Sequence, residues 1–366
     1  MPEFLRTPVA FAVVLGVLVF IHELGHYLAA RWVGVHVETF SIGFGRALTH
    51  WTDRRGTVWK LAWIPLGGYV KLHGQERPED VAPEVRASWQ DGRTFQEKSV
   101  GARALVVAAG PLANFLLAAV LFAALFAAVG RPTVTAVVGD VVAESAAARA
   151  GLLAGDRVLA IDGRPVARFE ELQRAVAAHP GQELRLTIRR DGSERDIVAI
   201  PESREQSGRP VGVLGVRGGA TEYQSMSLIQ AIPAGAAQTW DVVVQTLAGL
   251  WQMISGSRGA EDLGGPLRIA QLSGQVAQLG LASLVSFIAV LSVNLGLINL
   301  FPIPVLDGGH LVFFTAEALR GRPLPARAQE YGYRAGFALL IGLFVFATWN
   351  DLGHIGLFRW VAGLIG

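Results

Sequence analysis

The chain has 366 residues, of which 51% are hydrophobic and 17% are charged, with a formal net charge of +2 and no cysteine. Soluble domains usually have about a quarter of their residues charged, so the composition argues against an ordinary soluble enzyme. The small net charge favours no nucleic-acid partner, and the lack of cysteine excludes disulfide and thiolate chemistry.

The apolar residues gather in four blocks, at residues 8–30, 102–129, 281–301 and 335–349. A helix needs about 20 residues to cross the hydrocarbon core of a bilayer, and the first three blocks reach that length. The fourth block is shorter. A soluble core is the alternative, but it seldom forms separate runs this long. The pattern predicts a polytopic α-helical membrane protein with about four transmembrane helices.

Basic residues indicate the orientation of these helices. Arginine and lysine are frequent in residues 31–100, and four arginines lie in residues 320–334. The positive-inside rule places both loops in the cytoplasm, so both termini and residues 130–280 lie on the opposite side. The first block also resembles a signal peptide with a small-residue cleavage site at residues 29–30. Cleavage there would remove the ionisable residues discussed below, and we expect a retained helix.

The pattern of residues 31–100 predicts an irregular, partly β segment that is cytoplasmic or re-entrant. Residues 58–64 form a plausible strand between glycine-rich turns. Trp51, Trp59 and Trp63 suit the membrane interface, where tryptophan is enriched. We expect a membrane-associated β-hairpin here, with an ordinary soluble hairpin as the alternative.

The pattern of residues 131–217 predicts a small α+β domain, inserted between the second and third apolar blocks. Strands are expected at Val134–Val138, Arg157–Ile161, Leu184–Arg189 and Val211–Val216, with a helix at Phe169–Ala178. The run from Ala150 to Gly163 resembles a PDZ domain of the bacterial type. Such domains often bind a peptide C-terminus at a sheet edge, although a groove that serves only as a spacer or lid is equally open.

Residues 218–280 have an amphipathic helical pattern of intermediate polarity. Trp240 and Trp251 are compatible with a helix that lies on the outer membrane surface. Packing against the small domain is the other reading, and the pattern does not decide between them.

The first apolar block contains the run His22-Glu23-Leu24-Gly25-His26. Residues four apart return to nearly the same face of a helix, so both imidazoles can reach one cation. Neutral imidazole is a good zinc ligand, and Glu23 can accept a proton from water at the same ion. Ionisable side chains within a membrane span are costly, and a bound metal would compensate them.

A catalytic zinc site normally takes three protein ligands and keeps one position for water. Asp307 is the acidic residue nearest the third block, and His310 follows it closely. Pro302 and Pro304 prevent a regular helix before Asp307, and the glycines after it allow a tight turn that could aim its carboxylate. Either Asp307 or His310 could supply the third ligand on this reasoning alone.

Two motifs together carry a family resemblance. HExxH at residues 22–26 and Asn-x-x-Pro-x-Pro-x-Leu-Asp-Gly-Gly at residues 299–309 resemble the site-2 protease family of intramembrane zinc metalloproteases, and most closely its sigma-E-regulating branch. Further stretches fit that branch over nearly the whole chain: Gly43-Phe44-Gly45, residues 65–71, 109–114 and 263–267.

The resemblance implies a fold, a metal and residue roles. It implies four transmembrane helices, a membrane-embedded β-hairpin around residues 40–70 and a periplasmic PDZ domain. It also implies Zn²⁺ bound by His22, His26 and Asp307, with Glu23 catalytic, and leaves His310 a structural role. Residues that would bind substrate or support the site are Asn294, Asn299, Pro302, Pro304, Gly43 and Gly45. For the two asparagines, hydrogen bonding between helices is the alternative.

The implied function is regulated intramembrane proteolysis in the bacterial inner membrane, with the active site near the cytoplasmic side. Its substrates would be transmembrane segments of anti-sigma-factor type after a first periplasmic cut, and remnant signal peptides. Well-known members of the branch have two PDZ domains, whereas this chain has room for one, which puts their gating arrangement in doubt here. The competing readings are a non-catalytic PDZ-bearing membrane adaptor with a structural metal, and a membrane hydrolase acting on something other than peptides.

Overall fold

A computed structural model describes residues 3–76, 81–206, 209–219, 221–257, 259 and 264–355. The chain forms two compact units. We call Met1–Leu125 with Leu228–Gly366 the membrane unit, and Phe126–Ser227 the small unit. Leu263 of the stretch 263–267, and Arg77 of the basic loop, lie outside the described residues.

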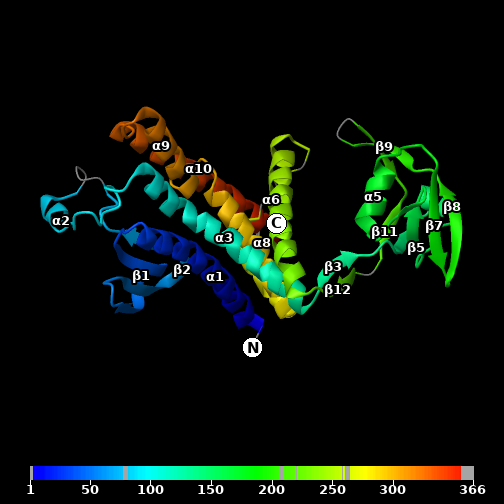
Figure 1. Ribbon diagram of the computed structural model, residues 1–366, viewed down its shortest axis with the longest axis horizontal. Helices are drawn as coiled ribbons and strands as arrows, with labels where there is room; N and C mark the ends of the chain where they lie inside the picture. Colours follow the sequence, from blue (N-terminus) through cyan, green and yellow to red (C-terminus); the bar gives the residue numbers. More distant parts are fainter. Residues whose placement is uncertain are drawn as a thin grey trace, which may run out of the picture. The chain divides into compact units, whose positions relative to one another are not determined.

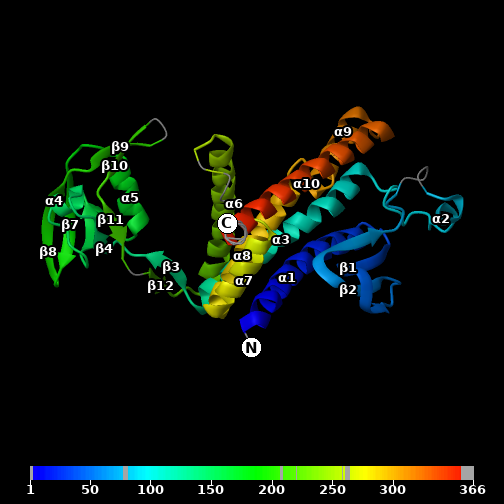
Figure 2. The ribbon, with the colours of Figure 1, turned by 180° about the vertical axis from the view of Figure 1, so that it is seen from behind.

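Four long helices form the membrane unit and run side by side (Figures 1 and 2). They are α1 (Glu3–Trp32), α3 (Val100–Ala128), α8 (Leu281–Asn299) and α10 (Ala326–Ile355). Each is long and apolar enough to cross a membrane, which confirms the expected polytopic helical class and its four spans among the described residues. α10 is longer than the fourth apolar block because its first turns are polar and precede that block.

The same unit contains four further helices among its described residues. α6 (Leu228–Ile254) and α7 (Pro266–Gln278) account for the helical pattern of residues 218–280, α9 (Asp307–Arg320) follows α8, and α2 (Pro83–Ala87) lies in the basic loop. α7 packs along α1, and the buried carboxylate of Asp351 on α10 accepts hydrogen bonds from the N–H groups at the start of α7. An anionic side chain at a helix N-terminus is a favourable arrangement.

The expected hairpin consists of β1 (Val37–Thr52) and β2 (Val58–Leu72), so the strand predicted at residues 58–64 is longer than expected. Both strands bend. The bend in β1 occurs at Gly43 and Gly45, whose φ values are +88° and +86°, a backbone region that glycine adopts without strain.

Because of these bends, the two strands form four paired segments. Residues 39–42 pair with residues 68–71 on one side and with residues 58–61 on the other. Residues 58–62 pair in turn with residues 47–52. Among the described residues, 68–72 therefore have a ladder partner on one side only. We call residues 68–72 the open edge.

The small unit contains helices α4 (Ala146–Arg149) and α5 (Phe169–Ala177) and ten strands among its described residues. One sheet has the order β6-β5-β7-β8, and three strand pairs join β9 with β10, β4 with β11 and β3 with β12. The strands are β3 (Arg131–Val134), β4 (Val138–Val141), β5 (Arg157–Ile161), β6 (Arg164–Pro165), β7 (Leu184–Arg190), β8 (Ser193–Ala199), β9 (Glu202–Gln206), β10 (Arg209–Val213), β11 (Val216–Gly218) and β12 (Thr221–Gln224).

The predictions for the small unit are confirmed at β5, β7 and α5, where alternating or helical burial produced a clear pattern. The strand predicted at Val134–Val138 is wrong, because the chain changes ladder partner there, from β12 to β11. The strand predicted at Val211–Val216 is also wrong. Gly215, at φ +78°, divides it into β10 and β11, which belong to different pairs.

Candidate metal centre

Two histidines lie one helical turn apart on α1. The Nε2 atoms of His22 and His26 are 3.2 Å apart. Glycines allow α3 to approach them closely, because a Cβ on Gly25 would lie 2.2 Å from the carbonyl oxygen of Ala109. Likewise, a Cβ on Gly110 would lie 2.3 Å from His26 Nε2. Small residues at this crossing therefore let α3 hold the His26 ring against its backbone.

Asp307 is the first residue of α9, and an irregular turn separates it from α8. Pro302 and Pro304 lie in this turn and cannot donate the backbone hydrogen bonds that a continuing helix requires. Val305 has φ +99°, which is unfavourable for a β-branched residue and indicates that the surrounding structure holds the turn. The turn directs Asp307 toward α1.

The expectation that the glycines after Asp307 form a turn is wrong, because both lie in the first turn of α9. A Cβ on Gly308 would lie 2.3 Å from the carbonyl oxygen of Leu300, and one on Gly309 would lie 2.4 Å from that of Ile303. The glycines thus allow the start of α9 to pack directly on the backbone that follows α8.

The side chains of His22, His26 and Asp307 converge on one point. Asp307 Oδ2 lies 3.2 Å from His22 Nε2 and 3.5 Å from His26 Nε2. Tetrahedral zinc with bonds of about 2.0–2.1 Å would place its ligand atoms roughly 3.3–3.4 Å from one another. Oδ2 is buried and makes no hydrogen bond of good geometry within the described part of the chain. The three donors therefore fit a small divalent cation.

His26 is held in the orientation that a ligand needs. Its Nδ1 lies 2.9 Å from the carbonyl oxygen of Val106 on α3, to which it can donate a proton. This bond leaves Nε2 with its lone pair directed at Asp307 and His22. A metal-ligating histidine usually donates its other ring N–H in this way.

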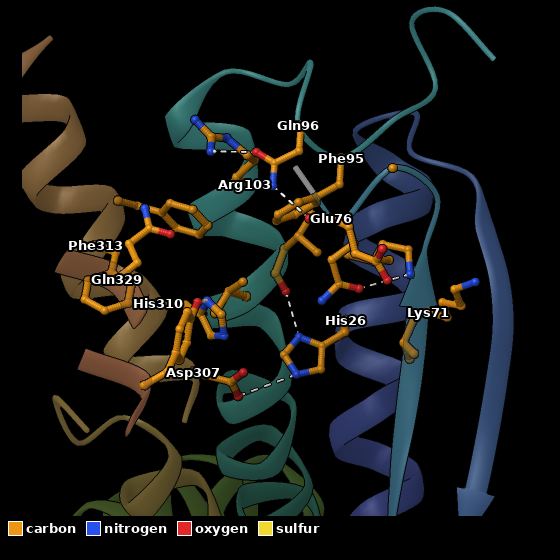
Figure 3. A pocket seen from close by; sticks show the side chains of 18 of the residues that line it. His26, Lys71, Glu76, Phe95, Gln96, Arg103, Asp307, His310, Phe313 and Gln329 are labelled. Carbon is orange, nitrogen blue, oxygen red and sulfur yellow. Dashed lines mark hydrogen bonds and ion pairs between the residues drawn. The ribbon is translucent and has the colours of Figure 1, made fainter. Parts of the chain in front are cut away.

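A cavity of about 1520 Å³ adjoins this cluster, and its lining includes His22, Glu23, His26 and Asp307. Figure 3 shows His26 and Asp307 facing each other across the cavity, from α1 and α9. Glu23 is 9% exposed. The open edge also lines the cavity and lies beside Glu23, because a Cβ on Gly68 would lie 3.1 Å from Glu23 Cγ.

His310 also lines the cavity, one turn beyond Asp307 (Figure 3). Its ring nitrogens lie outside the group of metal-competent side chains found among the described residues, which consists of His22, His26 and Asp307. His310 Nδ1 instead lies 3.3 Å from the hydroxyl of Tyr333. Burial lowers the pKa of His310 below its ordinary value.

The remaining predicted site residues do not line the cavity in this conformation: Asn294, Asn299, Pro302, Pro304, Gly43 and Gly45. Asn294 Oδ1 accepts a hydrogen bond from Thr246 on α6 at 2.9 Å, and Asn299 Nδ2 donates to Leu295 O within its own helix. A role of these residues toward substrate stays a prediction.

One ion pair was not anticipated from the sequence. Arg103 on α3 pairs with Glu317 on α9 at 2.5 Å, and its guanidinium lies over the ring of Phe314. Both charged side chains are largely buried. The pair ties α3 to the helix that begins with Asp307. In the sequence, Arg103 is visible only as an arginine at the start of an apolar block, and such a residue can have many roles.

Comparison with known proteins decides the family. The model of peptidase family M50 matches residues 10–343. The chain belongs to peptidase family M50. This agrees with the site-2 protease resemblance, and the M50 match begins within α1 and ends within α10.

Relatives match this M50 chain over nearly its full length. A candidate zinc metalloprotease of Rhizobium meliloti is 45% identical and covers 94% of this chain and 96% of its own. The regulator of sigma-E protease RseP of Escherichia coli is 34% identical, covering 97% and 100%. A PDZ domain of an SdrC-like protein from Listeria monocytogenes is 19% identical over 22% of this chain and 84% of its own, with a TM-score of 0.20.

Proposed function

We propose that the protein is an intramembrane zinc endopeptidase that cuts transmembrane segments of other membrane proteins. One observation carries the proposal: two histidines of α1 and the first residue of α9 converge at zinc-like spacings within a bundle of four apolar helices. Relatives with zinc metalloprotease names support the choice of metal.

The proposed division of labour follows from the site. His22, His26 and Asp307 would hold the ion, and the adjoining cavity leaves room for water and a substrate carbonyl. Zinc would supply a Lewis acid that activates water near neutral pH and polarises the carbonyl. Glu23, next to His22 and facing the cavity, would accept the water proton and deliver it to the leaving amine.

The open edge offers a way to present a substrate. A helical substrate hides its peptide bonds in its own hydrogen bonds, so it must be extended before it is cut. We propose that it adds as a strand to residues 68–72, which have no strand partner on one side and lie beside Glu23. Gly and Pro in the substrate would favour cleavage by weakening its helix.

The proposed substrates are single-pass membrane proteins of anti-sigma-factor type after a first periplasmic cut, together with remnant signal peptides. The support is the similarity to a relative named regulator of sigma-E protease. The basic loops support a location of the cavity near the cytoplasmic side of the bacterial inner membrane, and a periplasmic location of the small unit as a PDZ-type domain. A peptide C-terminus could then bind the small unit.

A non-catalytic adaptor with a structural metal is the second candidate. A structural zinc site is closed by a fourth protein ligand. Within the described residues, the group of metal-competent side chains has three members, and the nearby His310 is hydrogen-bonded to Tyr333. Three protein ligands would leave one coordination position of zinc for water or substrate, which favours catalysis.

The test is cleavage of a membrane-embedded reporter by the purified protein. Glu23→Gln should bind zinc as the wild type does, yet lower cleavage by at least about a hundredfold, because general-base catalysis contributes roughly 10²–10⁴-fold. A chelator should abolish wild-type cleavage, and added zinc should restore it. Full cleavage by Glu23→Gln would remove Glu23 from the proposed role, and chelator-resistant cleavage would remove the metal.

A further inference from the structure

Asn114 is a buried amide in the middle of the apolar helix α3, with no exposed surface. Its side-chain Nδ2 lies 3.2 Å from His22 Nδ1. It is therefore the polar contact of the His22 ring on the side opposite the metal-facing Nε2 atom. A primary amide placed at this depth is costly unless it has a specific partner.

Zinc binding by His22 would require a hydrogen-bond acceptor at its Nδ1 atom. If His22 binds the ion through Nε2, its Nδ1 must carry the proton and donate it to an acceptor. His26 meets the same demand through Val106 O. At His22, however, an amide N–H₂ group faces Nδ1, and N–H₂ can only donate.

The oxygen of the same amide also lacks a suitable partner. Asn114 Oδ1 is buried and finds no hydrogen-bond partner among the described residues. A buried acceptor without a partner costs about 1–3 kcal/mol in proteins generally. The oxygen and nitrogen of an amide have nearly the same shape, so a half-turn of the group exchanges them without moving neighbouring atoms. The half-turn gives the His22 Nδ1 proton an acceptor and gives the buried oxygen a hydrogen-bond partner.

We propose that Asn114 is a positioning residue of the metal centre: its Oδ1 accepts a proton from His22 Nδ1 and thereby directs the Nε2 lone pair at the metal. This inference rests on the proposed function, because it assigns His22 as a ligand. α3 would then orient both histidines: a backbone carbonyl accepts from His26, and a side-chain amide accepts from His22.

The bundle holds Asn114 in place independently of His22. The backbone oxygen of Asn114 accepts a hydrogen bond from Ser292 Oγ on α8 at 2.8 Å, and a Cβ on Gly296 would lie 3.4 Å from its Cβ. Ser292 is itself fully buried. The Asn114 backbone is thus fixed by an α3–α8 contact that involves no metal-facing atom, and that contact supplies a control.

The first test is zinc affinity, measured by competition with a chromophoric chelator on full-length protein in detergent. Asn114→Leu keeps the volume and removes the acceptor, and it should weaken zinc binding by about 10–100-fold. Asn114→Asp restores an acceptor and should bind zinc within a few-fold of the wild type. Ser292→Ala, which disturbs the same helix contact without changing the amide, should leave the affinity unchanged.

The results separate the possible failures. Wild-type affinity in Asn114→Leu would overturn the proposal, and an equal loss in the Leu and Asp variants would show that packing rather than an acceptor matters. His22→Ala should lose zinc in the same assay. If it does not, the metal centre itself is wrongly assigned, which is a failure of the proposed function and not of Asn114.

The second test needs no substitution at residue 114. Nitrogen chemical shifts of ¹⁵N-labelled histidine, with the His22 signals assigned by their loss in His22→Ala, report which ring nitrogen carries the proton. The zinc-bound wild type should show His22 protonated at Nδ1, with the chemical shift of a hydrogen-bonded N–H. A Nδ1 without a proton, or with the shift of an N–H that has no acceptor, would overturn the proposal.

Discussion

At the scale of single residues, the site depends on glycines, which allow close helix contacts, as much as on the proposed ligands. The His22 and His26 spacing was readable from the sequence because helical periodicity alone brings the two rings together. The positions of Gly25 and Gly110 were not, because their role appears only when α1 and α3 cross. Asp307 could be named only through the family motif, since no local pattern shows that a residue so far along the chain meets α1.

The glycine contact leads to a residue-scale prediction. Gly110→Ala places a methyl group 2.3 Å from Nε2 and 2.5 Å from Cε1 of His26, so the ring must move. Overpacking of this kind costs about 1–3 kcal/mol. We expect a lower melting temperature and at least tenfold weaker zinc binding, measured by calorimetry and chelator competition. Gly101→Ala is the matched control on the same helix, since its Cβ meets nothing within 4 Å. Equal behaviour of the two variants would refute the contact.

At the scale of elements, the long apolar helices were predicted well because about 20 consecutive apolar residues have few alternatives. The β segments were predicted less well. Residues 58–64 were predicted as a strand, and residues 58–61 prove to have partners on both sides, so they cannot be a free edge. Pairing between distant segments decides which edge is free, and periodicity does not encode it.

Capture at the open edge can be tested by cross-linking, because the chain has no natural cysteine. Lys71 has an exposed side chain that lines the cavity. In a Glu23→Gln background, Lys71→Cys should form a disulfide with a cysteine in the cleaved region of a substrate. His50→Cys lies in residues 47–52, at the other end of the ladder, and should not. Equal cross-linking at both positions, or at His50→Cys alone, would count against strand addition at residues 68–72.

At the scale of the whole molecule, the chain combines a helical membrane unit with a small unit that has its own core. The presence of an inserted α+β segment was predictable from the change in composition after the second apolar block. Its strand pairing was not, because several short strands there exchange partners at glycine turns. The small unit should therefore melt as a separate transition.

A buried ion pair gives that transition a pH dependence. Burial alone would raise the pKa of Asp156, but hydrogen bonds from Arg190 and from the N–H of Leu153 outweigh it and hold the pKa below its ordinary value. The carboxylate thus stabilises the folded unit above about pH 4, and this contribution is lost as pH falls through the lowered pKa.

Asp156→Asn should therefore lower the melting temperature of the small unit at pH 7 by on the order of 5 °C, and the difference from the wild type should shrink below about pH 4. Asp140→Asn is the control, since Asp140 is exposed and its ion pair with Arg217 is long, at 3.9 Å. A deficit in Asp156→Asn that persists unchanged in acid would contradict the pairing.

In the proposed metal centre, α1 and the start of α9 together bind one zinc ion. The most direct test of this binding is the zinc content of purified protein after chelation, reloading and desalting. The wild type and His310→Ala should each retain about one zinc per chain, whereas His22→Ala and Asp307→Ala should retain less than about a tenth of that. Full zinc content in Asp307→Ala would contradict the account, because the ion would then be held without α9.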